Sequence, residues 1–256
     1  MRILVTGSDG MIGSQLCAAL EKQEHEVVRF GDSKDIRKVD DWNYFATRVR
    51  YDYVIHLAAL AGVRPSFEDP IGYYDNNVVG MENMLHFASD NATRILYASS
   101  SNAHEWWGNP YATTKMMNEI QAKDYRAIGM RFHTVWPGRD DMLFKKLSKG
   151  EVTTINSTHK RDFVHIDDII SAITLLMDNF DEVKEQRLSV GASWVDIGTG
   201  EAVDVKDVAL AMGFEGEYNS MNPAGERVHT EADIRWLESF GWRPTKFIME
   251  QKDREL

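Results

Sequence analysis

Residues 2–13, RILVTGSDGMIG, decide how this chain folds. The first five form a short apolar run suited to a buried strand, and residues 14–23 continue with helical periodicity. Between strand and helix, glycines stand at positions 7, 10 and 13. A strand, a turn with this glycine spacing and a helix are together typical of a dinucleotide-binding turn. The alternative interpretation is a tight strand-to-helix turn that binds no ligand.

Each glycine has its own task in such a turn. Gly7 allows the tight bend, Gly10 lets the backbone approach a pyrophosphate, and Gly13 lets the helix pack close to the strand. The helix that begins here points its N–H groups and the positive end of its dipole at the phosphates. We therefore expect these three glycines, together with Met11 and Ile12, to bind the cofactor.

The composition excludes several classes of protein. With 256 residues and 43% hydrophobic side chains, the chain can form a real core, as one large domain or as a main domain with a small lobe. A net charge of −11 argues against binding to nucleic acid or to an anionic membrane. Cys17 is the sole cysteine, which favours a reducing compartment. No apolar run reaches membrane-spanning length, and the opening strand leaves no room for a signal peptide, so we expect a cytoplasmic protein.

The first half of the chain alternates between predicted strands and predicted helices. The strands cover residues 25–30, 53–59, 94–99 and 127–132, and the helices cover residues 40–49, 71–90 and 111–124. This order predicts an α/β fold of the Rossmann type, a doubly wound parallel sheet with helices on both faces.

Beyond residue 138 the predicted elements become shorter. Asp167 and Asp168 are predicted to cap a helix that ends near residue 179. A strand at 193–197 and short helices at 204–212 and 231–240 follow. We therefore predict two domains. Residues 1–136, with returning segments near 161–200, form the cofactor-binding Rossmann domain, and residues 137–160 and 201–256 form a reduced substrate-binding lobe.

Acidic residues near the end of the second strand bear on the choice of cofactor. Asp32 lies 19 residues after Gly13, where a carboxylate accepts hydrogen bonds from the adenosine ribose of NAD. A solvated turn aspartate is the alternative. Asp9 adds a second negative charge, which a 2′-phosphate would have to meet. The cations close in sequence are Arg29, Lys34 and Arg37. Charge therefore favours NAD over NADP.

A tyrosine and a lysine one helical turn apart indicate the chemistry. Tyr111 and Lys115 share one face of the predicted helix. A tyrosine with its usual pKa of about 10 is a poor base at neutral pH. A nearby ammonium favours the phenolate and lowers that pKa towards the working range. Ser100, at the end of the preceding strand, could orient a substrate hydroxyl.

A series of short motifs occurs along the chain in a fixed order. The motifs are TGSDGMIG (6–13), HLAA (56–59), YDNNVVG (74–80), YASSS (97–101), PYATTK (110–115), RDFVHIDD (161–168), DIGTG (196–200), AD (232–233) and GWRP (241–244). In this order they make the chain resemble the extended short-chain dehydrogenase/reductases, specifically the branch of nucleotide-sugar epimerases and dehydratases, over almost its whole length.

The resemblance implies roles for individual residues. Ser100, Tyr111 and Lys115 would be the catalytic set, and Tyr111 and Lys115 would also contact the cofactor. Arg161 matches the arginine that pairs with the diphosphate of the sugar nucleotide, with a surface charge as the alternative. The other implied cofactor contacts are Asp35, Ile36, Leu57, Ala58 and Ala59, and the other substrate contacts are Asn77, Ser100 and His133. No metal site is expected.

Several departures from the family pattern concern the substrate. The connection from Asp32 to Asp35 omits a helix and a strand that many relatives carry, and ten residues separate Ser100 from Tyr111. His133 stands where epimerases usually have an asparagine that touches the diphosphate. The lobe between residues 139 and 161 is also reduced. These differences suggest a minimal, more open substrate pocket.

The residues after Ser100 bear on the reaction. Dehydratases of the family place Asp-Glu there as acid and base, whereas this chain has Ser101 and Asn102. The cysteine and histidine of its epimerase-reductases are also missing. We therefore expect an NAD-dependent nucleotide-sugar 4-epimerase, an isomerase that acts through a transient 4-keto sugar.

Two other functions remain open at this point. The chain could be a one-way NAD(P)H-dependent reductase of a 4-keto deoxysugar nucleotide, or a non-catalytic NAD-binding regulator. The resemblance also implies that a homodimer could form through the helices at about 75–91 and 111–124, although nothing in the sequence shows that this pairing occurs.

Overall fold

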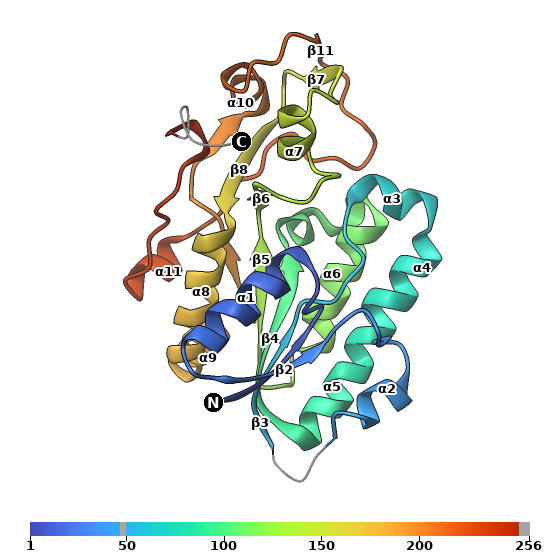
Figure 1. Ribbon diagram of the computed structural model, residues 1–256, viewed down its shortest axis with the longest axis vertical. Helices are drawn as coiled ribbons and strands as arrows, with labels where there is room; N and C mark the ends of the chain where they lie inside the picture. Colours follow the sequence, from blue (N-terminus) through green and yellow to red (C-terminus); the bar gives the residue numbers. More distant parts are fainter. Residues whose placement is uncertain (47–49, 251–256) are drawn as a thin grey trace. The chain divides into compact units, whose positions relative to one another are not determined.

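The computed structural model describes residues 1–46 and 50–250 (Figure 1). The chain divides into two compact units. The first contains residues 1–131 and 176–195, and the second contains residues 132–175 and 196–256. Residues 161–175 and 196–200, which we expected in the cofactor-binding domain, therefore fall in the second unit. The assignment of a cofactor and a substrate to separate domains stays a prediction.

A central parallel sheet of six strands organises the first unit, as the sequence predicts. Its strand order is β2-β1-β3-β4-β5-β9. The strands are β1 (Arg2–Thr6), β2 (Glu26–Phe30), β3 (Tyr51–His56), β4 (Ala92–Ser100), β5 (Ala127–Phe132) and β9 (Trp194–Ile197). Strand β1 pairs in parallel with β2 on one side and β3 on the other. The strand order therefore reverses at β1, which is where ligands bind in open sheets of this kind.

The sheet ends at β2 in the described part of the chain. After β2 the chain runs directly to helix α2 (Val39–Asn43), in agreement with the predicted omission of a helix and a strand. The predicted helix at 40–49 is shorter than expected, and its residues 47–49 lie outside the described residues.

Helices cover both faces of this sheet (Figure 1). They are α1 (Met11–Lys22), α3 (Val63–Glu68), α4 (Pro70–Tyr74), α5 (Gly80–Asn91), α6 (Pro110–Gln121) and α9 (Phe180–Ser189). Alternate residues of a strand point to opposite faces. Leu4 accordingly joins a buried cluster with Met81 and Leu85 of α5, while its neighbours Ile3 and Val5 are buried outside that cluster.

The predicted helix at 71–90 contains an irregular turn. A π-helical segment, η1 (Asp75–Val79), separates α4 from α5. Asn77, within this segment, is held by the backbone of Leu60 and by Thr114, so tertiary contacts favour the wide turn. Helices α3 and α9 were not predicted, because α3 is only six residues long and half of the residues of α9 are charged.

The second unit is built around short strands. Its elements are β6 (Thr134–Trp136), α7 (Leu143–Ser148), β7 (Thr154–Asn156), β8 (Lys160–His165), α8 (Ile166–Asp178), β10 (Ala202–Asp204), α10 (Val205–Ala211), β11 (Glu217–Asn219), α11 (Arg235–Ser239) and the 3₁₀ turn η3 (Ile248–Glu250). The strands form one sheet of order β10-β8-β6 and a pair β11-β7. Trp136, Phe163 and Val208 belong to its apolar core.

The predicted helix cap at residues 167–168 is wrong. Helix α8 already begins at Ile166. The buried Asp168 carboxylate instead accepts hydrogen bonds from the backbone N–H and the hydroxyl of Thr245 and from the backbone N–H of Lys246. It therefore fastens the C-terminal segment of the second unit to α8.

Candidate active site

The glycine turn between β1 and α1 has the shape that a dinucleotide requires. Gly7 has φ +65°, which favours glycine at the tight bend. A Cβ on Gly13 would lie 2.0 Å from the carbonyl oxygen of Gly7, so the helix and the turn are in direct contact. A Cβ on Gly10 would meet one atom within 4 Å, the Gly7 oxygen at 3.1 Å. Backbone at Gly10 is therefore open to a ligand, and the turn fits NAD.

The end of β3 lies against this turn. The backbone N–H of Leu57 donates to the carbonyl of Thr6, and that of Ala58 donates to the Thr6 hydroxyl. A Cβ on Gly7 would lie 2.8 Å from the Ala58 nitrogen, which explains why a glycine and small residues meet here. The predicted cofactor contact of Leu57, Ala58 and Ala59 stays a prediction, and it is consistent with this neighbourhood.

His56 is a buried structural histidine. Its Nδ1 lies 2.8 Å from the Thr6 hydroxyl. Burial, and then the positive charge of Lys115, lower the pKa of His56 to about 3. The side chain is therefore neutral at physiological pH.

Asp9 reaches across to the residues after β2. Its Oδ2 accepts a hydrogen bond of 2.8 Å from the backbone N–H of Asp32. The same carboxylate occupies the space beside Gly31, where a Cβ would lie 2.2 Å from it. The Asp9 carboxylate therefore lies against the backbone of Asp32, the residue predicted to contact the adenosine ribose.

The three cations nearest to Asp32 in sequence are each paired with a carboxylate. Arg29 lies 2.8 Å from Glu21, Lys34 lies 3.3 Å from Asp41, and Arg37 lies 2.8 Å from Asp35 and 2.9 Å from Asp75. A 2′-phosphate would have to compete with these carboxylates. This arrangement agrees with the preference for NAD.

The predicted adenine contacts have different surroundings. The Asp35 carboxylate is bound by Arg37, whose side chain lowers the pKa of that carboxyl group. Ile36 is buried, and its side chain packs against Gly80, where a Cβ would lie 2.5 Å away. Their contact with adenine stays a prediction.

Tyr111 and Lys115 lie on one face of α6. This helix begins with Pro110 and is capped by the Asn109 side chain, which accepts from the backbone N–H of Ala112. The Lys115 ammonium lies 6.0 Å from the centre of the Tyr111 ring. Tyr111 also contacts the ring of Tyr73 edge-on, with the ring centres 6.2 Å apart.

Lys115 is buried and tied to the end of β4. Its Nζ donates a hydrogen bond of 2.9 Å to the carbonyl oxygen of Ala98. Burial lowers the pKa of Lys115 to about 8, while the charge of Glu119 opposes that change. Residues 98–100 and α6 thus bring Ser100, Tyr111 and Lys115 into the same part of the first unit.

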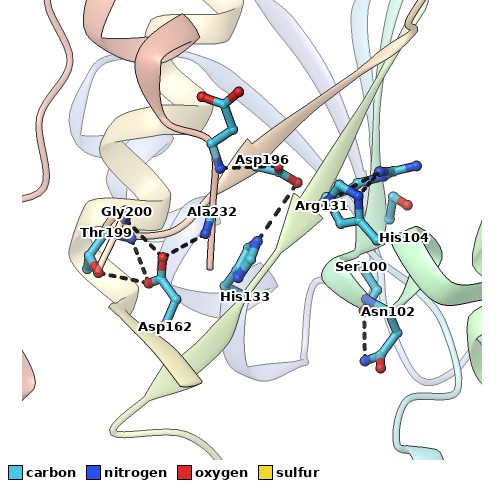
Figure 2. A network of polar contacts seen from close by, with 12 residues as sticks. Ser100, Asn102, His104, Arg131, His133, Asp162, Asp196, Thr199, Gly200 and Ala232 are labelled. Atoms are coloured by element: carbon cyan, nitrogen blue, oxygen red, sulfur yellow. Dashed lines mark hydrogen bonds and ion pairs between the residues drawn. The ribbon is translucent and has the colours of Figure 1, made fainter. Parts of the chain in front are cut away.

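Ser100 ends β4 and caps the 3₁₀ segment η2 (Ser101–Gly108). Its Oγ accepts hydrogen bonds from the backbone and the side-chain amide of Asn102, at 3.2 and 3.4 Å (Figure 2). Ser100 is the acceptor in both of these bonds, so its hydroxyl proton can still be donated. The side chain that donates to Ser100 in this cap is the amide of Asn102, not a carboxylic acid.

The amide of Asn77 is fully used by the protein. Its Oδ1 accepts from the Leu60 N–H and from Asn76, and its Nδ2 donates to the Leu60 carbonyl and to the Thr114 hydroxyl. An asparagine side chain has two donors and two acceptor sites, and all four are engaged. These bonds hold the segment after β3 against α6. The predicted substrate contact of Asn77 stays a prediction.

Two predicted substrate contacts, Arg161 and His133, lie in the second unit. The guanidinium of Arg161 donates to the carbonyls of Lys160 and Val228 and lies 3.2 Å from His159 Nδ1. Burial lowers the pKa of Arg161, and a carboxylate, Glu226, lies 3.9 Å away.

His133 is buried with neither ring nitrogen hydrogen-bonded among the described residues. Its Nε2 is 3.8 Å from the Asp196 carboxylate (Figure 2). In the same unit, Asp162 accepts hydrogen bonds from the backbone N–H groups of Thr199, Gly200 and Ala232. It therefore fixes the Gly-Thr-Gly turn after β9.

Glu119 and Arg131 form a buried ion pair that was not predicted from the sequence. Two hydrogen bonds of 2.7 Å join the two side chains. Glu119 stands four residues after Lys115, as Lys115 does after Tyr111, so the helical spacing was a usable signal. No such signal pointed to Arg131, the partner on β5, because its distance from Glu119 depends on the order of the strands in the sheet.

Comparisons with known proteins give a consistent result. A model of the NAD dependent epimerase/dehydratase family matches residues 3–191. Protein CapI of Staphylococcus aureus is 32% identical over 234 residues, which cover 69% of this chain and 69% of that protein. UDP-glucuronate 4-epimerase 4 of Arabidopsis thaliana is 28% identical over 312 residues, covering 95% of this chain and 71% of that protein.

Among solved structures, MoeE5 in complex with UDP-glucose and NAD is similar with a TM-score of 0.81. The two are 26% identical, and the match covers 98% of this chain and 96% of that chain. The alignment with the plant epimerase is longer than this chain, so that relative carries residues that this chain lacks. This agrees with the predicted short connections.

Proposed function

This chain belongs to the NAD dependent epimerase/dehydratase family, and we propose that within it the chain is a nucleotide-sugar 4-epimerase. Membership confirms the predicted family, its fold class and NAD as the cofactor. The relatives include UDP-glucuronate 4-epimerases and a protein solved with UDP-glucose. We therefore propose UDP-glucose, UDP-glucuronate or an N-acetylated relative as the substrate.

One observation supports the choice of a 4-epimerase over a dehydratase. The side chain that donates to Ser100 Oγ belongs to Asn102, an amide that cannot remove a proton or protonate a leaving hydroxyl. A dehydratase needs both of these acid–base steps. A 4-epimerase needs only a base for the 4-hydroxyl, a group to orient it and a cofactor. Ser100, Tyr111 and Lys115 supply the first two.

In the proposed mechanism, Tyr111 takes the proton of the sugar 4-hydroxyl and later returns it. The buried Lys115 ammonium favours the phenolate form of Tyr111, and Ser100 donates a hydrogen bond that orients the substrate oxygen. NAD, held at the glycine turn, supplies the chemistry of accepting a hydride from C4 and giving it back. Holding the sugar close while it presents its other face contributes most of the remaining rate enhancement.

We propose that the second unit binds the nucleotide diphosphate. A guanidinium suits a diphosphate because it is planar and always charged, which supports Arg161 in this role. The unpartnered ring nitrogens of buried His133 support a polar ligand for that side chain.

The described helices include none long and apolar enough to cross a membrane.

The test is incubation of the purified chain with NAD and each candidate sugar nucleotide. We expect a 4-epimer, separated by anion-exchange chromatography and identified by NMR, with no net oxidation or reduction of the dinucleotide. Tyr111→Phe is the matched control, and we expect it to lose more than about 99% of the activity. Absence of every 4-epimer would overturn the proposal, and stoichiometric oxidation of added NADH would instead indicate the reductase.

Dimerisation through α5 and α6 stays a prediction. Val79, just before α5, and Ile120 on α6 are 43% and 65% exposed, which supports a protein partner for this surface. Analytical ultracentrifugation of the chain and of Ile120→Lys tests the pairing, and a monomeric wild-type chain would contradict it.

A further inference from the structure

The buried ion pair of Glu119 and Arg131 lies one helical turn beyond Lys115. The two residues are 5% and 3% exposed. Arg131 Nε and Nη2 each donate a bond of 2.7 Å, one to each carboxylate oxygen. Such a bidentate pair is directional, but burying two charges costs free energy that an apolar pair of the same size does not. Stability alone is therefore a weak reason for its presence.

Glu119 joins α6 to the strand end that carries Ser100. Its Oε1 accepts a bond of 2.5 Å from the Ser99 hydroxyl. One turn earlier, Lys115 donates to the carbonyl of Ala98. Two consecutive residues of β4 are thus tied to two consecutive turns of α6. Because side chains alternate along a strand, fixing Ser99 also fixes the direction in which Ser100 leaves the strand.

Arg131 extends this connection to the segment that follows Ser100. Its Nη1 lies 3.0 Å from Nδ1 of His104, a residue of η2 (Figure 2). Its guanidinium carbon lies 3.5 Å from the centre of the Trp194 ring on β9, a cation–π contact. An arginine can only donate, so the His104 nitrogen accepts with its lone pair. Arg131 is therefore fixed from α6, η2 and β9 together.

The charge of Glu119 also acts on Lys115. Burial is the main effect on the pKa of Lys115, which falls to about 8, and the Glu119 carboxylate raises it. The other titratable groups near the ammonium are Tyr111 on α6 and His56 on β3, and His56 is kept neutral by burial and by Lys115 itself. Glu119 thus keeps a larger fraction of Lys115 protonated at neutral pH.

We propose that the Glu119–Arg131 ion pair is a positioning device for Ser100, Tyr111 and Lys115, and that His104 connects this pair to residues 101–108. This positioning role rests on the proposed function, since it assumes that these three side chains act on a substrate. The geometry and the effect on Lys115 exist without any ligand. They can therefore be tested separately from the epimerase activity.

The first experiment measures the protonation of Lys115 directly. The full chain is prepared with lysine carrying ¹³C at Cε, and the Cε shift is followed by NMR from pH 6 to pH 11. Lys115→Met assigns the resonance. We expect a midpoint near 8 in the wild-type chain. In Glu119→Gln we expect a midpoint about one pH unit lower, because the negative charge that raises it is removed.

Two further variants separate positioning from folding. Glu119→Leu combined with Arg131→Met replaces the buried pair by apolar side chains, a change that proteins often tolerate. We expect this double variant to fold and still to show the lower Lys115 midpoint. Glu21→Gln is the matched control, because Glu21 also pairs with an arginine but is 47% exposed. A folded double variant with the wild-type Lys115 midpoint would overturn the proposal.

A second experiment tests the His104 connection. Hydrogen exchange followed by mass spectrometry compares the wild-type chain with His104→Ala. We expect the amides of residues 101–108 to exchange about fivefold faster, because the bond to Arg131 is lost. His229→Ala removes an exposed histidine that pairs with Glu231 and serves as the control. Unchanged exchange in residues 101–108 of His104→Ala would remove this residue from the proposal.

Discussion

Two ion pairs of nearly equal length occupy opposite surroundings in the first unit. Glu119 and Arg131 are joined at 2.7 Å beside the end of β4, where both are buried. Glu21 and Arg29 are joined at 2.8 Å between α1 and β2, where the side chains are 47% and 40% exposed. Water already solvates the exposed pair, whereas each buried charge depends on its partner. The surroundings, rather than the distance, decide what each charge does.

The contrast also separates the two ends of the proposed cofactor site. Around the end of β4, the buried Glu119 carboxylate raises the pKa of Lys115 against the effect of burial, and it also accepts a hydrogen bond from Ser99. Around the end of β2, carboxylates pair with Arg29, Lys34 and Arg37, and the negative charges of Asp9 and Asp32 would repel a phosphate. We expect changes in the first region to alter rate and stability strongly, and changes in the second to alter selectivity modestly.

The largest effect is expected for Lys115→Met. Epimerase activity should fall by about 10²- to 10⁴-fold, because the ammonium that favours the Tyr111 phenolate is gone. The variant should nevertheless be more stable at pH 7, by about 2 kcal/mol, because a buried charge with a depressed pKa is removed. The folded pKa lies below the unfolded one, so the wild-type chain should regain this stability as pH rises from about 8 to about 10.5.

Product assays and urea unfolding at pH 7 and pH 10 check both parts of this prediction. Lys22→Met, at the exposed end of α1, is the control. A Lys115→Met protein that is inactive and also less stable than the wild type at pH 7 would contradict the description of a costly buried charge.

The next largest effect is expected for Arg131→Met. Removing one partner of a buried pair leaves the Glu119 carboxylate uncompensated, so the free energy of unfolding should fall by about 3–5 kcal/mol. Urea unfolding monitored by circular dichroism measures this change. Arg29→Met is the matched variant for the exposed pair. Equal losses in the two variants would show that burial does not make the Glu119–Arg131 pair more important for stability than the exposed pair.

An intermediate effect is expected for His56 in acid. The pKa of His56 is about 3 in the folded chain and about 6.5 when unfolded, so the unfolded state binds the extra proton as pH falls below 6.5. At pH 4.5 this should remove about 2–3 kcal/mol relative to pH 7.5. In His56→Gln that part of the acid loss should vanish, as urea unfolding at the two pH values would show. His86→Gln, on the exposed face of α5, is the control.

A smaller effect is expected on cofactor selectivity. In the double variant Asp9→Asn and Asp32→Asn, the two negative charges are removed while the amide oxygen of residue 9 can still accept from the backbone N–H of residue 32. We expect the affinity for NADP relative to NAD to rise by about tenfold, as measured by calorimetry. Asp90→Asn removes an exposed charge elsewhere. An unchanged ratio would mean that the two carboxylates do not face the ribose.

The smallest effect is expected for the exposed pair itself. Glu21→Gln should change the free energy of unfolding by less than about 0.5 kcal/mol. Urea unfolding in low and high salt measures this, and the difference from wild type should shrink further in high salt. A loss as large as that of Arg131→Met would again contradict the comparison.

Features determined by neighbouring residues could be predicted from the sequence, whereas features determined by contacts between distant residues could not. The strand, glycine turn and first helix were predicted because their signals are contiguous, and α6 begins within one residue of its predicted start. The π-helical turn at 75–79 was missed because contacts with Leu60 and Thr114 favour it. Asp168 was wrongly assigned to a helix cap because its actual partners, residues 245 and 246, are far away in sequence and come near it only in the folded chain.

The candidate site divides in the same way. The spacing of Tyr111 and Lys115 predicts a shared helix face, and the same spacing reaches Glu119. The burial of Lys115 and its bond to Ala98 depend on how α6 packs on β4, so the sequence could not predict the pKa near 8. The saturation of the Asn77 amide likewise depends on a backbone segment 17 residues away.

Because the connection after β2 is short, β2 is an edge strand of the sheet in the described part of the chain. An edge strand presents free backbone groups to any extended segment that meets it, including another copy of the same strand. Here Glu26 and Arg29 project from β2 into water. Charged side chains on an edge strand hinder the addition of a further strand. Replacing both Glu26 and Arg29 by valine would therefore be expected to promote self-association into insoluble aggregates.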